Sequence, residues 1–191
     1  MPPPFIYING YPGVGKLTIA KLLSNRIENS KVVDNHLLID PVASVFDRSM
    51  NEYQPLRKLV RTNILYSIAA STSTKDVTWI FTDQQSSSAQ GSSAAQDYQN
   101  AATAKKSRFI SVILNCGLDE NIKRLRESGR GGSVNTKLTN VAILRSIREN
   151  EDLYSFGGKD ELQLDVSNLS APQAVDLILD HLGTTQKIFV C

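Results

Sequence analysis

The sequence predicts one α/β domain in which a parallel β-sheet is covered by helices on both faces. Its 191 residues suit a single core of ordinary size. Apolar strand-like segments alternate along the chain with segments whose apolar residues recur at helical spacing, which is typical of a parallel sheet. A glycine-rich segment joins the first strand-like segment directly to the first helical one. In such a sheet, ligands bind at the carboxyl ends of the strands.

The first strand, residues 5–8, leads into the segment 10–18, which we call the phosphate loop. It carries the pattern G-x-x-x-x-G-K, with Gly10, Gly15 and Lys16 in register. Glycines let the backbone curl so that several N–H groups point at one anion. Lysine and the helix N-terminus then add positive charge for the outer phosphates. A turn without a ligand explains the glycines but has no use for a lysine at a helix start, so this segment predicts nucleoside triphosphate binding.

Every residue of the phosphate loop is an expected nucleotide contact: Gly10, Tyr11, Pro12, Gly13, Val14, Gly15, Lys16, Leu17 and Thr18. The usual motif places a hydroxyl residue directly after the lysine, where it reaches Mg²⁺. Here Leu17 occupies that place, and the hydroxyl follows at Thr18. We therefore expect ATP and Mg²⁺ as ligands, with Thr18 as the loop's candidate for the metal.

The remaining elements follow in alternation. Four further segments are rich in β-branched and aromatic residues and predict strands: 31–34, 77–83, 109–116 and 162–166. Helical spacing of apolar residues predicts helices at 54–72, about 93–106, 118–127 and 137–153. A last helix is expected to begin around Pro172 and to end at Gly183.

Two stretches interrupt this periodicity. Residues 84–95 are rich in Ser, Gln and Ala, and predict either a mobile loop over the site or a surface loop without function. Residues 127–140 contain Gly129, Gly131 and Gly132 around Arg130, and predict a flexible lid. Both are expected to be parts of one domain spanning residues 1–191.

Composition excludes several classes of protein. A net charge of +2 gives no polybasic surface for nucleic acid or membrane, and no apolar run is long enough to span a bilayer. The N-terminus does not have the pattern of a signal peptide. Two cysteines need no disulfide framework, which fits a reducing compartment. We therefore expect a cytoplasmic protein whose partner is a small molecule.

The loop pattern G-x-x-G-x-G-K-x-T resembles that of adenylate kinase and related nucleoside monophosphate kinases. This branch of the P-loop proteins includes shikimate and gluconate kinases, chloramphenicol phosphotransferase and the zeta toxins. Gly10, Gly13, Gly15, Lys16 and Thr18 match the pattern position by position. The resemblance implies a three-layer α-β-α P-loop NTPase fold with a five-stranded parallel sheet in the order 2-3-1-4-5. It also implies an arginine-bearing lid after the fourth strand, and a metal held largely through water.

Asp34 ends the second predicted strand, beside the phosphate loop. In the resembling small-molecule kinases, an aspartate at this place orients the substrate hydroxyl or accepts its proton. The other interpretation is a residue that caps the following helix. His36 is a candidate acceptor contact, or a hydrogen-bonded structural histidine. Asp83 ends the third strand and is the candidate carboxylate for Mg²⁺, although aspartate is also common in turns that follow strands.

Arginines form two further groups of candidates. Arg57 and Arg61 lie on one face of a predicted helix, and either hold an anionic substrate or belong to a solvated basic face. Lys123, Arg124, Arg126 and Arg130 lead into the predicted lid. By position, Arg126 and Arg130 resemble lid arginines that stabilise the charge developing during phosphoryl transfer.

The leading prediction is an ATP-dependent kinase that phosphorylates a hydroxyl or phosphate of a small molecule, with Lys16, Asp34, Arg126 and Arg130 as catalytic residues. A nucleoside monophosphate kinase is one alternative, and it needs arginines in the acceptor pocket. A nucleotide-binding switch or assembly subunit that transfers no phosphate is the other.

Overall fold

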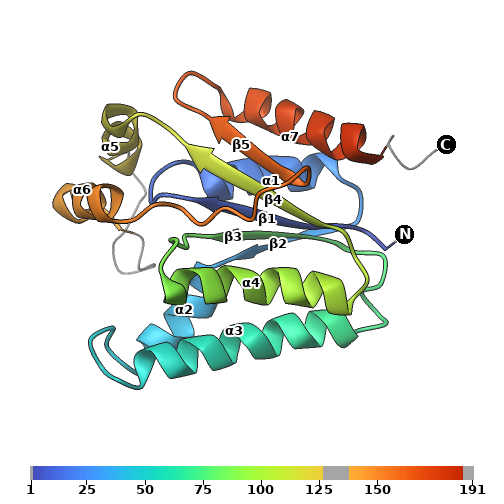
Figure 1. Ribbon diagram of the computed structural model, residues 1–191, viewed down its shortest axis with the longest axis horizontal. Helices are drawn as coiled ribbons and strands as arrows, with labels where there is room; N and C mark the ends of the chain where they lie inside the picture. The colour runs from blue at the N-terminus through green and yellow to red at the C-terminus, as the bar shows by residue number, and fades with distance from the viewer. Residues whose placement is uncertain (1, 127–137, 187–191) are drawn as a thin grey trace.

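The computed structural model describes residues 2–126 and 138–186. Its centre is a five-stranded parallel sheet with the strand order β2-β3-β1-β4-β5 (Figure 1). In that order the strands are β2 (Ser30–Asp34), β3 (Thr78–Asp83), β1 (Phe5–Gly10), β4 (Phe109–Asn115) and β5 (Glu161–Asp165). The predicted α/β fold class and the strand order implied by the resemblance are both confirmed.

Helices cover both faces of the sheet and produce three layers (Figure 1). One face is covered by α1 (Lys16–Arg26) and α7 (Ala171–Gln186), the other by α3 (Tyr53–Ala70) and α4 (Ala89–Ala104). Side chains alternate along each strand, so Ile6 and Ile8 pack under α1 and α7 while Phe5 and Tyr7 pack under α3 and α4. Both faces are therefore apolar, as a parallel sheet requires.

Three shorter helices lie at the carboxyl end of the sheet: α2 (His36–Ala43), α5 (Leu118–Arg126) and α6 (Val141–Asn150) (Figure 1). The sequence did not delimit α2, because its eight residues include Pro41 and are too few to show a clear apolar period. α6 is shorter than the predicted helix 137–153. The Asn140 side chain caps its start, and the backbone is extended at Glu151.

The expected loop at 84–95 is confined to residues 84–88, because α4 begins at Ala89. The Ser88 hydroxyl caps this helix by accepting a hydrogen bond from the Gly91 N–H at 3.1 Å. A Cβ added to Gly91 would lie 2.3 Å from the Ser86 carbonyl oxygen, so only glycine allows this close return of the chain. The prediction that Gly183 ends the last helix was also wrong, because α7 continues to Gln186.

The predicted lid at 127–140, with Arg130, lies almost wholly outside the described residues, and only its last three residues are included. Among the helices of the described ranges, none combines the length and the apolar character needed to cross a membrane.

Candidate functional site

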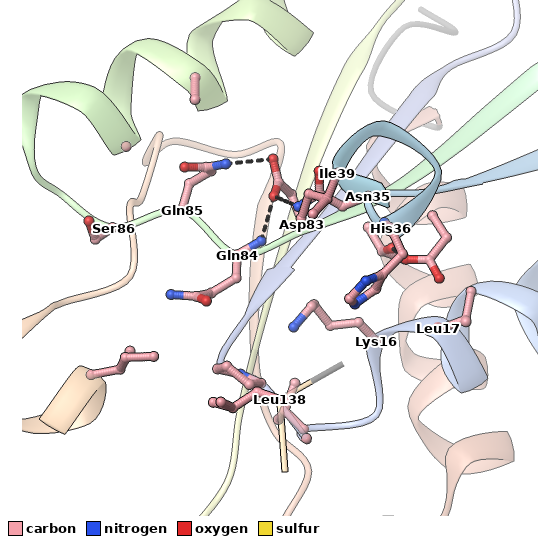
Figure 2. Close-up of a pocket in the computed structure, with 18 of the residues that line it drawn as sticks. Lys16, Leu17, Asn35, His36, Ile39, Asp83, Gln84, Gln85, Ser86 and Leu138 are labelled. Carbon is pink, nitrogen blue, oxygen red and sulfur yellow. Dashed lines mark hydrogen bonds between the residues drawn. The ribbon is translucent and has the colours of Figure 1, made fainter. Parts of the chain in front are cut away.

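The carboxyl ends of β1, β2 and β3 open into one cavity of about 1650 Å³. The phosphate loop and the start of α1 form one side of it, and the start of α2 and the residues after β3 line it as well (Figure 2). Residues of α3 and α6 complete the lining. Pockets for a single small ligand usually measure about 300–1000 Å³. The cavity is therefore large enough for two ligands side by side.

Glycines shape the phosphate loop. Gly13 and Gly15 have φ angles of 87° and 106°, a conformation that side chains rarely adopt. A Cβ on Gly10 would lie 2.7 Å from the Leu114 carbonyl oxygen of β4, and one on Gly13 would lie 2.9 Å from the Asn121 amide nitrogen. Gly15 leaves the start of α1 without a side-chain cap. An uncapped helix start that follows a curled loop is suited to an anion.

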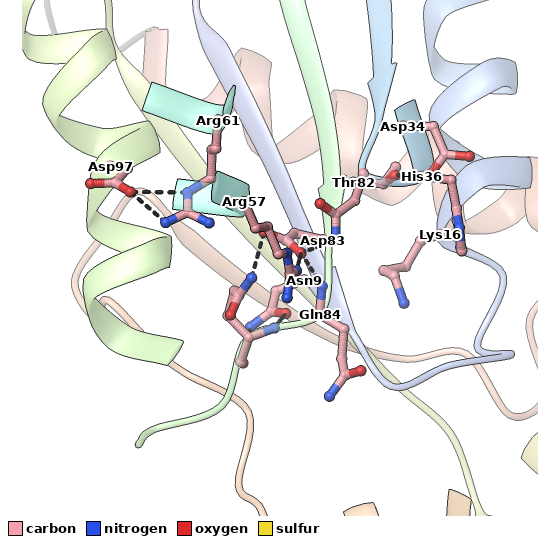
Figure 3. A network of polar contacts seen from close by, with 12 residues as sticks. Asn9, Lys16, Asp34, His36, Arg57, Arg61, Thr82, Asp83, Gln84 and Asp97 are labelled. Atoms are coloured by element: carbon pink, nitrogen blue, oxygen red, sulfur yellow. Dashed lines mark hydrogen bonds and ion pairs between the residues drawn. The ribbon is translucent and has the colours of Figure 1, made fainter. Parts of the chain in front are cut away.

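Lys16 lies across this loop. Its Nζ donates hydrogen bonds to the carbonyl oxygens of Gly10 at 2.6 Å and Tyr11 at 2.9 Å. His36 lies beside Lys16 in both close-up views (Figures 2 and 3). The His36 Nδ1 is 3.7 Å from an Asp40 carboxylate oxygen. The loop lysine and the predicted acceptor contact therefore belong to the same cavity.

Asp34 lies at the end of β2 and is half-buried at the cavity wall. The strand register pairs it with Thr82 of β3, whose hydroxyl donates to the Asp34 Oδ1 at 3.1 Å. The same oxygen accepts a long hydrogen bond from the His36 N–H at 3.4 Å. The carboxylate therefore contacts the start of α2 and also faces the cavity. A residue that caps the helix and a residue that acts on an acceptor are thus compatible interpretations of Asp34.

Asp83 occupies the expected strand end, but its side chain is fully buried. One carboxylate oxygen accepts from the Gln84 N–H at 2.8 Å and from the Asn35 amide, and the other accepts from the Gln85 amide at 2.8 Å. The Tyr98 hydroxyl also hydrogen-bonds this carboxylate. Burial, then the nearby Asp83 charge, raises the pKa of Tyr98 well above its usual value, so the hydroxyl remains a donor.

Arg57 and Arg61 are not a solvated basic face. Arg61 is buried, and its Nε and Nη2 donate to one Asp97 oxygen at 2.9 and 2.7 Å. The Arg57 guanidinium is half-buried and lies 3.9 Å from an Asp83 oxygen (Figure 3). Both arginines line the cavity, and each has an internal carboxylate partner.

Asn9 connects the strand ends and was not predicted as a site residue. Its side-chain oxygen accepts from the N–H groups of Gly10 and Gln85, at 3.0 and 2.9 Å. Its amide donates to the carbonyl oxygens of Gln85 and Tyr154. The phosphate loop, the segment after β3 and the segment before β5 therefore share one buried polar residue.

The basic cluster on α5 divides into two. Arg124 lines the cavity and donates to the carbonyl oxygens of Val14 and Val166, at 3.1 and 2.8 Å. Arg126 is exposed and does not line the cavity. Its role as a lid arginine stays a prediction, as does that of Arg130, which lies outside the described residues.

Arg148 of α6 was not singled out from the sequence. Its guanidinium lies 4.6 Å from the centre of the Tyr11 ring and donates to Asn121 and to the Cys116 carbonyl oxygen. Asn121 in turn donates to the Pro12 carbonyl oxygen at 2.8 Å. The sequence could predict only that Arg148 lies on a helix, because its partners come from distant parts of the chain.

The residues fit Mg²⁺ only in part. Among the residues of the described ranges, no group of three or more His, Cys, Asp or Glu side chains is arranged to hold a metal. Thr18 and Asp34 offer oxygen atoms to the cavity, and oxygen is the ligand that Mg²⁺ prefers. Asp83 already accepts hydrogen bonds at both oxygens, so its assignment to the metal stays a prediction.

Solved structures similar to this chain share its fold at low sequence identity. A tunicamycin resistance protein from Deinococcus radiodurans is 18% identical, with a TM-score of 0.59, over 95% of this chain and 96% of its own. A gluconokinase from Sinorhizobium meliloti is 11% identical, with a TM-score of 0.65, over 96% and 93%. The APS kinase of Mycobacterium tuberculosis, solved with AMPPNP and APS, is 13% identical, with a TM-score of 0.59, over 95% and 98%.

No protein-family model matches the sequence, and no curated protein matches it significantly. The likeness to solved structures extends over nearly the whole chain and includes the five-stranded sheet order. The chain therefore has the fold of the P-loop small-molecule kinases.

Proposed function

We propose that this protein is an ATP-dependent phosphotransferase that moves the γ-phosphoryl group of ATP to a hydroxyl of a small molecule. The observation that carries the proposal is the position of Asp34. It lies on the wall of one large cavity whose other side is the phosphate loop with Lys16. A carboxylate facing a phosphate loop provides what phosphoryl transfer to a hydroxyl needs: a bound triphosphate and a group that orients the attacking oxygen.

Each residue has a defined part in this reaction. The loop amides and Lys16 bind the β- and γ-phosphates. Asp34 holds the acceptor hydroxyl and takes its proton as the new O–P bond forms and the bond between the γ-phosphorus and the bridging oxygen of ADP breaks. Thr18 of the phosphate loop is the cavity residue that would hold Mg²⁺, and the metal would neutralise charge on the phosphates.

The test is acceptor-dependent release of ADP by the wild type, Asp34→Asn and Lys16→Ala. We expect Asp34→Asn to lower turnover by about 10²–10⁴-fold while the Kd for ATP changes by less than about threefold. Lys16→Ala should weaken ATP binding itself, because it removes the charge that faces the phosphates. Asp176→Asn is the control, because Asp176 is an exposed residue of α7 paired with Arg26. Full turnover by Asp34→Asn would overturn the proposal.

A nucleotide-dependent switch without phosphotransfer is the second candidate. It is supported by Leu17 in the place of the usual hydroxyl and by the complete burial of Asp83. This candidate predicts tight ATP binding and no ADP release with any acceptor.

A further inference from the structure

On the side of the cavity opposite the phosphate loop, arginines line the cavity but are paired with aspartates. We call this side the acceptor wall: the cavity-lining residues of the segment 34–61, of the end of β3 and of residues 84–94. Two arginines of this wall are not exposed, Arg57 and Arg61. Two such arginines would ordinarily indicate an anionic substrate. Their surroundings indicate a different one.

Arg61 is neutralised from behind by α4. Its side chain is 8% exposed and that of Asp97 is 17% exposed, and the two are joined by two hydrogen bonds to one carboxylate oxygen. Charges paired at this depth are weakly screened by solvent, so the carboxylate cancels most of the field of the guanidinium. Arg61 thus lines the cavity without giving it a net positive charge.

Arg57 is compensated in the same way, by the fully buried Asp83 at 3.9 Å. The charged groups of this wall that are not exposed are two arginines, Arg57 and Arg61, and two aspartates, Asp34 and Asp83. Asp97, which lies behind Arg61, is counted as a third aspartate. Their formal sum is negative. Two further cations, Arg48 and Lys58, are exposed, so water and salt weaken their attraction for a bound anion.

Beside these charges, the wall carries many neutral hydrogen-bonding groups. The lining contains these amide and hydroxyl side chains: Gln54, Gln84, Gln85, Ser86, Ser88, Gln90 and Ser93. Gln85 is engaged with Asp83, whereas the Gln84 side chain extends away from Asp83 in both close-up views (Figures 2 and 3). Amides and hydroxyls both donate and accept, which is what a molecule with several hydroxyl groups requires of its site.

We infer that the acceptor is a neutral polyhydroxylated molecule, of the sugar or cyclitol class, and that Asp97 sets this preference by neutralising Arg61. A carboxylate- or phosphate-bearing acceptor would meet a wall whose unexposed charges, with Asp34 included, sum to a negative value. The inference rests on the proposed phosphotransfer, and it makes Asp97 a specificity-determining residue that touches no reacting atom.

The experiment compares acceptors in matched pairs: an aldose with its aldonate, and a nucleoside with its 5′-monophosphate. Acceptor-stimulated ADP release gives kcat/KM for each member. In the wild type, we expect the neutral member of an accepted pair to be favoured by about tenfold or more. Asp97→Asn exposes the Arg61 charge to the cavity and should shift this ratio about tenfold toward the acid, the change produced by about 1.4 kcal/mol.

Asp160→Asn is the matched control. Arg108 donates to one Asp160 oxygen at 2.9 and 2.7 Å, the same distances as in the Arg61–Asp97 pair, and neither residue lines the cavity. This variant should leave the ratio unchanged. Arg61→Gln is the second variant, and it should disfavour the acids further because Asp97 then keeps its charge uncompensated.

The outcomes separate the two proposals. A wild type that prefers the acidic members, or a ratio that Asp97→Asn and Arg61→Gln leave unmoved, overturns the inference while phosphotransfer stands. Absence of ADP release with every acceptor overturns phosphotransfer, and the inference with it.

Discussion

Asp34 and Asp83 illustrate how neighbouring strand ends give the same residue type two different surroundings. Asp34 shares one oxygen between a hydroxyl and a long backbone contact, and faces the cavity. Asp83 is fully buried, and both of its oxygens accept hydrogen bonds. The first faces the cavity, as the proposed reaction requires, whereas the second accepts hydrogen bonds at the strand ends and pairs with Arg57.

We therefore expect substitution by asparagine to separate stability from turnover. Asp83→Asn should lower the free energy of unfolding by about 3 kcal/mol, because it leaves buried donors and the Arg57 charge without their partner. Asp34→Asn should lower it by less than about 1 kcal/mol. Urea denaturation of the two variants without nucleotide measures both. Equal, small losses would show that Asp83 does not organise the site and would favour its assignment to the metal.

Both positions were predictable from the sequence, because each ends an apolar strand. Their hydrogen-bond partners were not, since Asn35 and Arg57 reach Asp83 only after α2 and α3 pack against the sheet. The same holds for Arg61, whose partner Asp97 is on a helix 36 residues further along the chain.

At the scale of elements, α6 lines the cavity with Ile143 and Ile147 and also contacts the phosphate loop. Arg148 lies over the Tyr11 ring, and the Tyr11 hydroxyl donates to the Glu151 carbonyl oxygen at 2.8 Å, just after the helix. Asn121 of α5 connects Arg148 to the loop at Pro12. These contacts join α5 and α6 to the phosphate loop.

Arg148→Met should weaken ATP binding by about tenfold, because the loop loses its contact with the guanidinium and Asn121 loses a donor. Calorimetric titration with a non-hydrolysable ATP analogue measures the change. Arg145→Met is the matched control, because Arg145 is exposed on the same helix. An unchanged Kd for Arg148→Met would show that the loop keeps its shape without α6.

The close packing of Gly91 on Ser86 fixes the start of α4 and, with it, the segment that carries Gln84 and Gln85. Gly91→Ala should destabilise the fold by about 2 kcal/mol and raise the KM for the acceptor more than that for ATP, because the added Cβ would displace the backbone of this segment. Gly183→Ala is the control. Its Cβ meets nothing within 4 Å, so the helix should gain up to about 1 kcal/mol. Thermal unfolding and steady-state kinetics of both variants test this, and equal KM values for the wild type and Gly91→Ala would contradict it.

At the scale of the whole molecule, the strand order 2-3-1-4-5 brings the ends of β1, β2 and β3 side by side. The phosphate loop follows one of these strands and the two aspartates end the other two. This order therefore places the two predicted ligands in a single cavity between elements that are far apart in the chain.

A ligand held between such elements should stabilise the fold as a unit. With a non-hydrolysable ATP analogue and Mg²⁺ at about 100 times the Kd, the free energy of unfolding should rise by about 2.7 kcal/mol. For a chain of this length that corresponds to a Tm increase of roughly 5–10 °C, measured by thermal unfolding. Lys16→Ala should abolish the shift at the same concentration. A shift that survives in this variant would show that the analogue binds elsewhere.

The fold class, the strands and the phosphate loop were predictable from the sequence, because they depend on local patterns: alternating apolar segments, and glycines that allow the φ angles of residues 13 and 15. The partners of the charged side chains depend instead on how the elements pack. Asp97 cancels Arg61, and Arg148 joins α6 to Tyr11, because such partners are chosen by packing between distant elements. Burial, which no local pattern sets, then decides whether a charge faces a ligand or is neutralised within the protein.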